Sequence, residues 1–132
     1  LGGFPVTRGS ADREAIKRCI AVLEAGEPLV LFPEGERKSG PVVHPLFDGA
    51  TYIAVKAGVP IVPVAIAGSE RAMPKGAKWI RPAKVHVIVG APMSAPTELV
   101  GKAQRDAVRV LSTELHAELQ RLLDAAHAKQ SN

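Results

Sequence analysis

Short, continuous apolar runs alternate with longer segments of helical period along this chain. Apolar runs of about four to eight residues bounded by Gly or Pro are typical of buried strands, whereas apolar residues three and four positions apart are typical of helices. The runs predict strands at residues 4–7, 29–33, 60–66 and 84–90. The helical spacing predicts helices at residues 11–25, 46–57 and 97–127. This order predicts an α/β fold with a mainly parallel β-sheet flanked by helices and with a long C-terminal helix.

The length and composition are those of a single domain. Of 132 residues, 46% are hydrophobic and only 4% are aromatic, so one core built mainly from aliphatic side chains is expected. The single cysteine, Cys19, excludes an internal disulfide. It shares an apolar stripe of helical spacing with Ile16 and Leu23, so we interpret it as a core residue and not as a nucleophile.

Charged residues follow two of the predicted strands at the point where each strand ends. Glu34, Gly35 and Arg37 follow the second apolar run, and Arg8 follows the first. Parallel neighbouring strands present their carboxyl ends at one edge, where α/β sheets bind ligands. Two guanidinium groups at that edge would suit a phosphomonoester, because planar bidentate donors match phosphate oxygens. The alternative is a turn in which Glu34 and Arg37 simply pair in solvent.

Residues 71–84 carry five cations and no acidic residue, with Trp79 among them. Such a segment fits an anionic membrane surface, with Lys75, Lys78, Trp79 and Arg81 as the contacts. The alternative is a solvated loop whose Trp79 packs back onto the sheet. Nucleic acid is not expected as a partner, because the chain has one Trp and no recognised nucleic-acid-binding fold. No apolar segment reaches the roughly 18 to 20 residues that cross a bilayer.

Three sequence blocks occur in the order typical of a known family. They are Phe32-Pro33-Glu34-Gly35-x-Arg37, the segment Gly2 to Arg8, and the apolar segment Val59 to Val64. Together they resemble the glycerolipid acyltransferase family, which contains the 1-acylglycerol-3-phosphate acyltransferases, over roughly residues 1–92. The chain departs from the family pattern at three places: Glu36 replaces the usual Thr, Lys38 replaces a frequent Ser, and Phe4 lies one place early.

The resemblance implies an enzyme that moves a fatty acyl group from acyl-CoA or an acyl carrier protein to lysophosphatidic acid or a similar glycerolipid in phospholipid synthesis. The donor brings its own activated thioester, so no metal or redox cofactor is expected. The implied location is cytoplasmic, peripheral on the cytoplasmic face of a membrane. Glu34 would support catalysis. The residues implied to bind the acceptor phosphate are Arg8, Arg37, Glu34, Gly35, Gly3 and Phe4.

The family's catalytic motif, His-x-x-x-x-Asp, is absent from these 132 residues. In it, the histidine takes the proton from the acceptor hydroxyl and the aspartate orients the imidazole. The residues five places after the four histidines are Gly49, Ala91, Arg121 and Asn132. His44 and Asp48 are one position too close together, and they follow the glutamate block instead of preceding it.

We therefore expect the catalytic pair upstream of Leu1 and no activity from this chain alone. The chain would be a single acyltransferase domain truncated at its N-terminus, with the sheet and acceptor site in residues 1–96 and the C-terminal helix in residues 97–132. One alternative is a non-catalytic anion- or membrane-binding module. Another is an acyltransferase that acts on a different lipid alcohol or on an amine.

Overall fold

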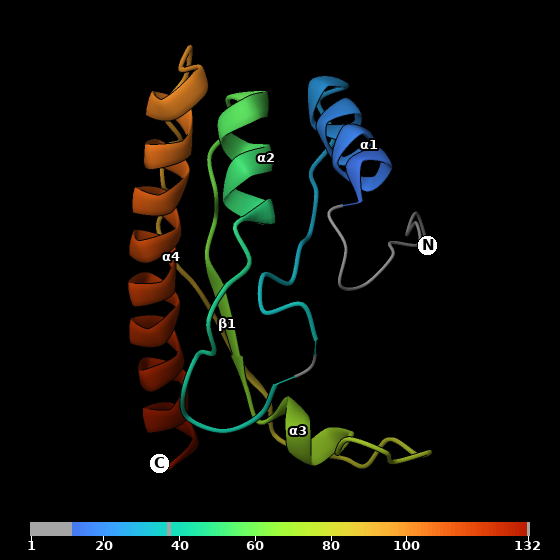
Figure 1. Cartoon of the computed structure of the whole chain (residues 1–132). Coiled ribbons are helices and arrows are strands. Elements are labelled where there is room, and N and C mark those ends of the chain that lie inside the picture. Colours follow the sequence, from blue (N-terminus) through green and yellow to red (C-terminus); the bar gives the residue numbers. More distant parts are fainter. Residues whose placement is uncertain (1–11, 37, 132) are drawn as a thin grey trace.

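The computed structural model describes residues 12–36 and 38–131. In chain order its elements are α1 (Arg13–Glu24), α2 (Gly49–Ala57), β1 (Val64–Ala67), α3 (Ser69–Ala72), β2 (His86–Val89) and α4 (Gly101–Gln130) (Figure 1). The predicted strand at 4–7 lies outside the described residues, as do the predicted site residues Gly3, Phe4, Arg8 and Arg37.

The longest element is α4, a helix of 30 residues that runs the length of the described structure (Figure 1). Its buried side chains share one face, and they are Val108, Leu111, Leu115, Leu122 and Ala126. This helix packs against β1, β2 and α2, so its apolar face is docked on the sheet. It begins at Gly101 and not at residue 97, because Val100 has extended backbone angles. No helix within the described ranges combines the length and the apolar character that crossing a membrane requires.

The two strands form an antiparallel pair in the described part of the chain, with Val64 opposite Val89 and Ala67 opposite His86. An isolated bridge between Ile61 and Met93 extends the pairing beyond Pro63. The prediction of a mainly parallel sheet is therefore wrong for these residues. The physical reason lies in the connection, because residues 68–85 leave and return at the same end of the pair. A parallel partner needs a crossover to the opposite end.

The apolar run at 29–33 is not a strand, contrary to the prediction. An extended segment becomes a strand only when a neighbouring strand pairs with it through a ladder of backbone hydrogen bonds. Among the described residues, the run has a backbone bond to another segment only at its end, from Phe47 N to Pro33 O at 2.9 Å, and this does not make a ladder. The side chains are exposed accordingly: Val30 is 78% exposed and Phe32 is 75% exposed. The run between Pro28 and Pro33 thus connects α1 to the following turn without entering the sheet of β1 and β2.

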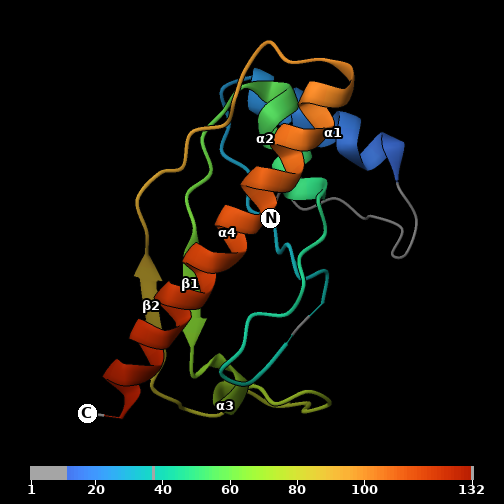
Figure 2. The same ribbon diagram turned by 60° about the vertical axis from the view of Figure 1, so that its left-hand side comes forward.

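The two faces of the sheet differ in burial. Helix α4 covers one face (Figure 2), where Ala65 and Ala67 are buried. The register places Val64 with Val89 and Ile66 with Val87 on the other face, and all four of these side chains are partly exposed to solvent. Small residues under α4 allow the helix to approach the strands closely.

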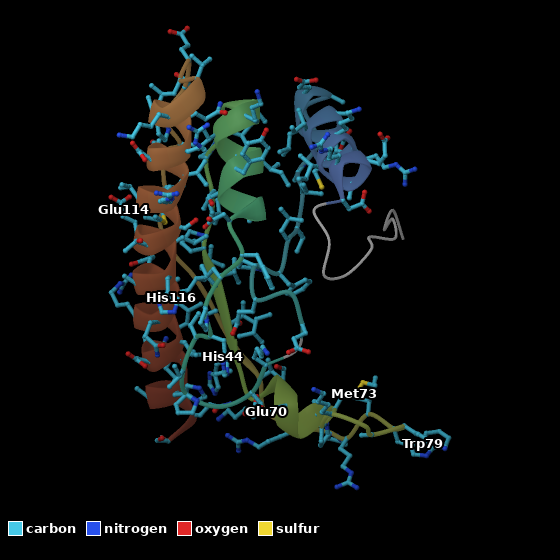
Figure 3. All side chains as sticks on the ribbon, viewed as in Figure 1. His44, Glu70, Met73, Trp79, Glu114 and His116 are labelled. Carbon is cyan, nitrogen blue, oxygen red and sulfur yellow. The ribbon has the colours of Figure 1, made fainter. Side chains whose placement is uncertain are left out.

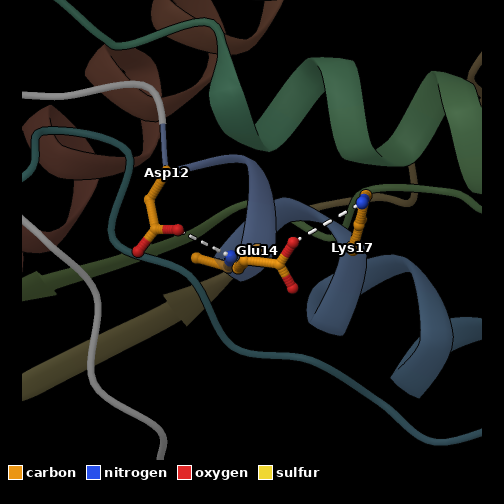
Figure 4. Close-up of polar contacts among 4 residues, drawn as sticks. Asp12, Glu14 and Lys17 are labelled. Atoms are coloured by element: carbon orange, nitrogen blue, oxygen red, sulfur yellow. Dashed lines mark hydrogen bonds and ion pairs between the residues drawn. The ribbon is translucent and has the colours of Figure 1, made fainter.

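The first two helices agree closely with the sequence pattern. Helix α1 begins after Asp12, whose Oδ1 accepts a hydrogen bond from Ala15 N at 3.0 Å (Figure 4). Lys17 Nζ lies 3.5 Å from Glu14 Oε1 on its exposed side (Figure 4). Cys19 lies on the buried side, which confirms its interpretation as a core residue. Burial raises the pKa of its thiol and thereby disfavours the nucleophilic thiolate.

Candidate functional site

The candidate site begins at the turn formed by residues 32–35. Gly35 N donates to Phe32 O at 3.0 Å, and Gly35 has a left-handed φ of 74°. A Cβ at this position would lie 2.6 Å from Cε2 of Phe47. Glycine is therefore required both by the backbone conformation and by the neighbouring ring. In the structure the group packed against Gly35 is the ring of Phe47, and the predicted role of Gly35 in binding the acceptor stays a prediction.

Glu34 links this turn to a second segment, residues 41–48, which we call the strap. Glu34 Oε2 accepts a hydrogen bond from the backbone N–H of His44 at 3.0 Å. Beside it, Phe47 N donates to Pro33 O at 2.9 Å. A carboxylate that accepts from a backbone amide makes one of the stronger classes of hydrogen bond. In the described residues Glu34 thus positions the strap, and the alternative in which it pairs with Arg37 is untested, because Arg37 lies outside them.

Helix α4 holds the other side of the strap through polar side chains. Gln120 Oε1 accepts from Val43 N at 2.8 Å, and Gln120 Nε2 donates to Pro41 O at 2.8 Å. His116 Nε2 lies 2.9 Å from Val43 O, and because a carbonyl only accepts, this ring nitrogen carries the proton. Figure 3 shows His116 on α4 and His44 on the adjacent strap. The strap is consequently fixed between the turn at 32–35 and α4.

A third contact fixes the end of the strap where α2 begins. Ser112 Oγ donates to Asp48 Oδ1 at 2.8 Å and lies 2.6 Å from Thr51 Oγ1. Thr51 is only 1% exposed, so this hydroxyl pair is an internal connection between α2 and α4. The carboxylate of Asp48 is held by Ser112, and His44 is held through its backbone N–H. Among the described residues, His44 and Asp48 thus make their hydrogen bonds to different partners, Glu34 and Ser112.

An open groove of about 570 Å³ runs between the strap and α4. Its walls come from Pro45, Leu46 and Asp48 on the strap side and from Arg109, Ser112, Thr113 and His116 on the helix. Its lining residues include one cation, the exposed Arg109, and one acid, Asp48. The groove runs along the strap, and neither Glu34 nor Gly35 is among the residues that line it.

Sequence reasoning missed the polar residues of α4 that hold the strap. Ser112, His116 and Gln120 are spaced by four and form a polar column parallel to the buried apolar face. That regular spacing was the available signal, because residues four apart lie on one side of a helix.

The structure brings together only some of the residues that the sequence pointed to. Glu34 and Gly35 lie in one turn, as predicted. The four predicted membrane contacts lie elsewhere, on the connection between α3 and β2. The convergence of Arg8 and Arg37 remains a prediction, because both lie outside the described residues.

Comparisons with known proteins agree with the sequence blocks. The family model described as "Acyltransferase" matches residues 1–67. The chain is 36% identical over 96 residues to the chloroplastic 1-acyl-sn-glycerol-3-phosphate acyltransferase BAT2 of Brassica napus, covering 70% of this chain and 28% of that protein. It is 34% identical over 93 residues to the 1-acyl-sn-glycerol-3-phosphate acyltransferase of Bacillus subtilis (strain 168), covering 70% of this chain and 44% of that protein.

A solved structure shows the same arrangement of elements. The 1-acyl-sn-glycerophosphate (LPA) acyltransferase PlsC from Thermotoga maritima superposes with a TM-score of 0.71 at 26% sequence identity. The match covers 92% of this chain and 46% of the Thermotoga chain. The present chain thus spans less than half the length of each of these three proteins.

Proposed function

The chain belongs to the acyltransferase family, and from this premise we propose that the whole protein transfers a fatty acyl group to a lysophosphatidic acid-like acceptor. The acyl donor would be acyl-CoA or an acyl carrier protein, and the product would enter phospholipid synthesis. The observation that carries the proposal is the turn at 32–35. In this turn Glu34 fixes the strap, and Arg37 follows the turn closely in the sequence. The relatives named above are 1-acyl-sn-glycerol-3-phosphate acyltransferases, which supports the same acceptor class.

The reaction needs a hydroxyl nucleophile, a base and a leaving thiolate. The acceptor oxygen forms a bond to the thioester carbonyl carbon, the C–S bond breaks, and the hydroxyl proton passes to a general base and then to the thiolate. No histidine of these residues is followed by Asp at the family's spacing. The proposal therefore assigns acceptor binding and loop positioning to this chain, and it assigns the general base to residues outside it.

Within the proposal, Arg37 and Arg8 bind the acceptor phosphate. A guanidinium donates two parallel hydrogen bonds to a phosphate and stays charged at any working pH. Glu34 holds the strap through His44 N, so its effect on the acceptor is indirect. Gly35 keeps the turn tight against Phe47.

The proposal is tested by acceptor selectivity in the whole protein. Acyl transfer from acyl-CoA is measured with lysophosphatidic acid and with a monoacylglycerol of the same acyl chain, which lacks the phosphate. Two charge-assisted contacts at about 1.5 to 3 kcal/mol each predict that kcat/KM falls by at least a hundredfold without the phosphate. Equal use of both acceptors would reject the phosphate site. Binding of lysophosphatidic acid without any turnover would favour the non-catalytic binding module.

A further inference from the structure

The connection between α3 and β2 forms a lobe that extends away from the rest of the chain (Figures 1 and 3). We call residues 71–84 the cationic loop. A backbone hydrogen bond joins the two sides of this loop, because Arg81 N donates to Ala72 O at 2.8 Å. Between Ala72 and Arg81 the chain makes a turn, in which Ala77 N donates to Pro74 O at 2.9 Å and Gly76 has a left-handed φ of 86°. The lobe is thus a hydrogen-bonded structure and not a featureless connection.

The last turn of α4 anchors the base of the cationic loop. Gln130 Oε1 accepts from Arg71 Nη2 at 3.0 Å, and Gln130 Nε2 donates to Lys84 O at 3.5 Å. Gly68 lies against the same amide and the same carbonyl so closely that a Cβ has no room. One side chain therefore joins both ends of the loop to the longest helix, so the orientation of the loop is coupled to the body of the protein.

The far part of the loop presents large apolar side chains to solvent. Trp79 is 82% exposed and Ile80 is 78% exposed. Figure 3 shows Trp79 near the end of the lobe, far from α4, with Met73 closer to its base. The alternative in which Trp79 packs back onto the sheet is therefore wrong. Adjacent exposed Trp and Ile side chains are costly in water and mark an interaction surface.

The charge of the chain is concentrated in this loop. The five cations are Arg71, Lys75, Lys78, Arg81 and Lys84, and all of them are exposed. The chain has a formal net charge of +4, with 17 Lys and Arg against 13 Asp and Glu, and no acidic residue lies within the loop. The residues outside the loop therefore hold 12 basic side chains against 13 acidic ones. An anionic partner would be attracted to this lobe in particular.

We propose that the cationic loop docks the protein on an anionic phospholipid surface. Trp79 and Ile80 enter the boundary between headgroups and acyl chains, and Lys75, Lys78 and Arg81 contact lipid phosphates. Trp is favoured at this boundary because its ring is apolar and its N–H reaches a polar partner. A lipid surface accepts the apolar pair and the cations together. Nucleic acid would also attract the cations, but binding by stacking uses several aromatic side chains for successive bases, and this loop has one.

Docking of this kind is independent of the proposed acyl transfer, because it requires no turnover and none of the residues of the turn at 32–35. It would serve that reaction by holding the protein at a surface that contains lipid acceptors. The orienting element is Gln130, since it fixes the base of the loop to α4.

The test uses Trp79 as its own reporter, because it is the single Trp of the 132 residues. The chain is titrated with phosphatidylcholine vesicles and with mixed phosphatidylcholine and phosphatidylglycerol vesicles, and Trp emission is recorded. We expect a blue shift, and quenching by lipids with brominated acyl chains, with the anionic vesicles only. The association should weaken as salt is raised. Emission that stays at the solvent-exposed position in both mixtures would overturn the proposal, as would a blue shift that depends on protein concentration without vesicles.

Two triple variants distinguish binding through the cationic loop from an attraction that depends only on the net charge of the protein. Lys75→Gln, Lys78→Gln and Arg81→Gln together should weaken association with anionic vesicles by about a hundredfold, given about tenfold or less for each charge near the surface. The control is Lys102→Gln, Arg105→Gln and Lys129→Gln, which removes two Lys and one Arg at exposed positions of α4. Equal losses in the two variants, or tighter binding to an oligonucleotide than to vesicles, would contradict the proposal.

Discussion

The carboxylate of Glu34 accepts a hydrogen bond from the backbone N–H of His44 at 3.0 Å, and this contact joins the turn at 32–35 to the strap. Gln120 and His116 of α4 hold the same strap from its other side. The described part of the candidate site is therefore a loop fixed on two sides. Its geometry depends on these side chains as much as on the turn itself.

Replacing Glu34 tests its positioning role. Glu34→Gln keeps an oxygen that can accept from His44 N, whereas Glu34→Ala removes the acceptor. We expect Glu34→Ala to lower the free energy of unfolding by about 1 to 3 kcal/mol and Glu34→Gln to cost about 1 kcal/mol less. Urea denaturation provides the measurement, and hydrogen exchange of the His44 amide reports the contact directly. Equal stability of both variants and the parent chain would show that the contact contributes nothing.

Gly35 offers a second test of the same turn. Gly35→Ala should lower the free energy of unfolding by about 1 to 3 kcal/mol, because φ is 74° and the new Cβ would lie 2.6 Å from Phe47 Cε2. Gly40→Ala is the matched control, since its φ is 100° but no atom lies within 4 Å of the added Cβ. The difference between the two variants in urea denaturation measures the Phe47 contact. Adding Phe47→Ala to Gly35→Ala should remove that difference, and its persistence would contradict the steric explanation.

Gln120 is expected to control the order of the strap. Gln120→Ala removes hydrogen bonds to Val43 N and Pro41 O, at a cost of about 1 to 3 kcal/mol in unfolding free energy. The Val43 amide should then exchange faster with solvent, whereas amides within α1 should not change. Thr113→Ala is the control, because Thr113 bonds only to its own helix at Arg109 O. Unchanged exchange of Val43 in the Gln120 variant would show that other contacts hold the strap.

The helices were predictable because their apolar spacing is a property of the local sequence. The face of α4 that contains Leu111 and Leu115 repeats at three and four positions, and the helix buries that face. The direction of strand pairing was not predictable in this way. The strands are antiparallel because residues 68–85 return to the end of the strand pair from which they left. The apolar pattern of each strand would be the same in a parallel and in an antiparallel pair, so it does not indicate the direction.

The sequence was sufficient to predict the turn at 32–35, but not the hydrogen bonds that hold the strap beside it. Glu34 and Gly35 stand in a compact block, so their proximity follows from the sequence. The bond from Val43 to Gln120 joins residues 77 positions apart, and that from His44 to Glu34 joins residues 10 apart. The first contact depends on how α4 lies on the rest of the chain, which the period of a single helix does not determine. The second depends on how the strap folds back onto the turn. The exposure of Trp79 was likewise a tertiary property.

The pair of Glu118 and Arg121 predicts a specific dependence on pH. Two hydrogen bonds, from Arg121 Nε at 2.9 Å and Nη2 at 2.6 Å, lower the pKa of the Glu118 carboxyl. Because the folded-state pKa is depressed, the contribution to stability is present above the ordinary Glu pKa and is lost as pH falls through the folded pKa. Arg121→Gln should raise the pKa of Glu118, as followed by NMR titration of its carboxyl carbon. Arg105→Gln, the control, should leave the pKa of Glu118 unchanged. An equal rise in both variants would mean that the pKa responds to the net charge of the protein and not to the contact with Arg121.

The phosphate site is tested most directly at Arg37 in the whole protein. Arg37→Lys keeps the positive charge and loses the planar fork, so use of lysophosphatidic acid should fall by about tenfold to a hundredfold in kcat/KM. The KM for the acyl donor should not change, because the proposed contact is to the acceptor alone. Arg105→Lys, at an exposed position of α4, is the control. Monoacylglycerol provides the decisive comparison: an acceptor without phosphate should respond equally to Arg37→Lys and to the control. A defect that follows the donor, or that is as large for monoacylglycerol as for lysophosphatidic acid, would assign Arg37 to another part of the reaction.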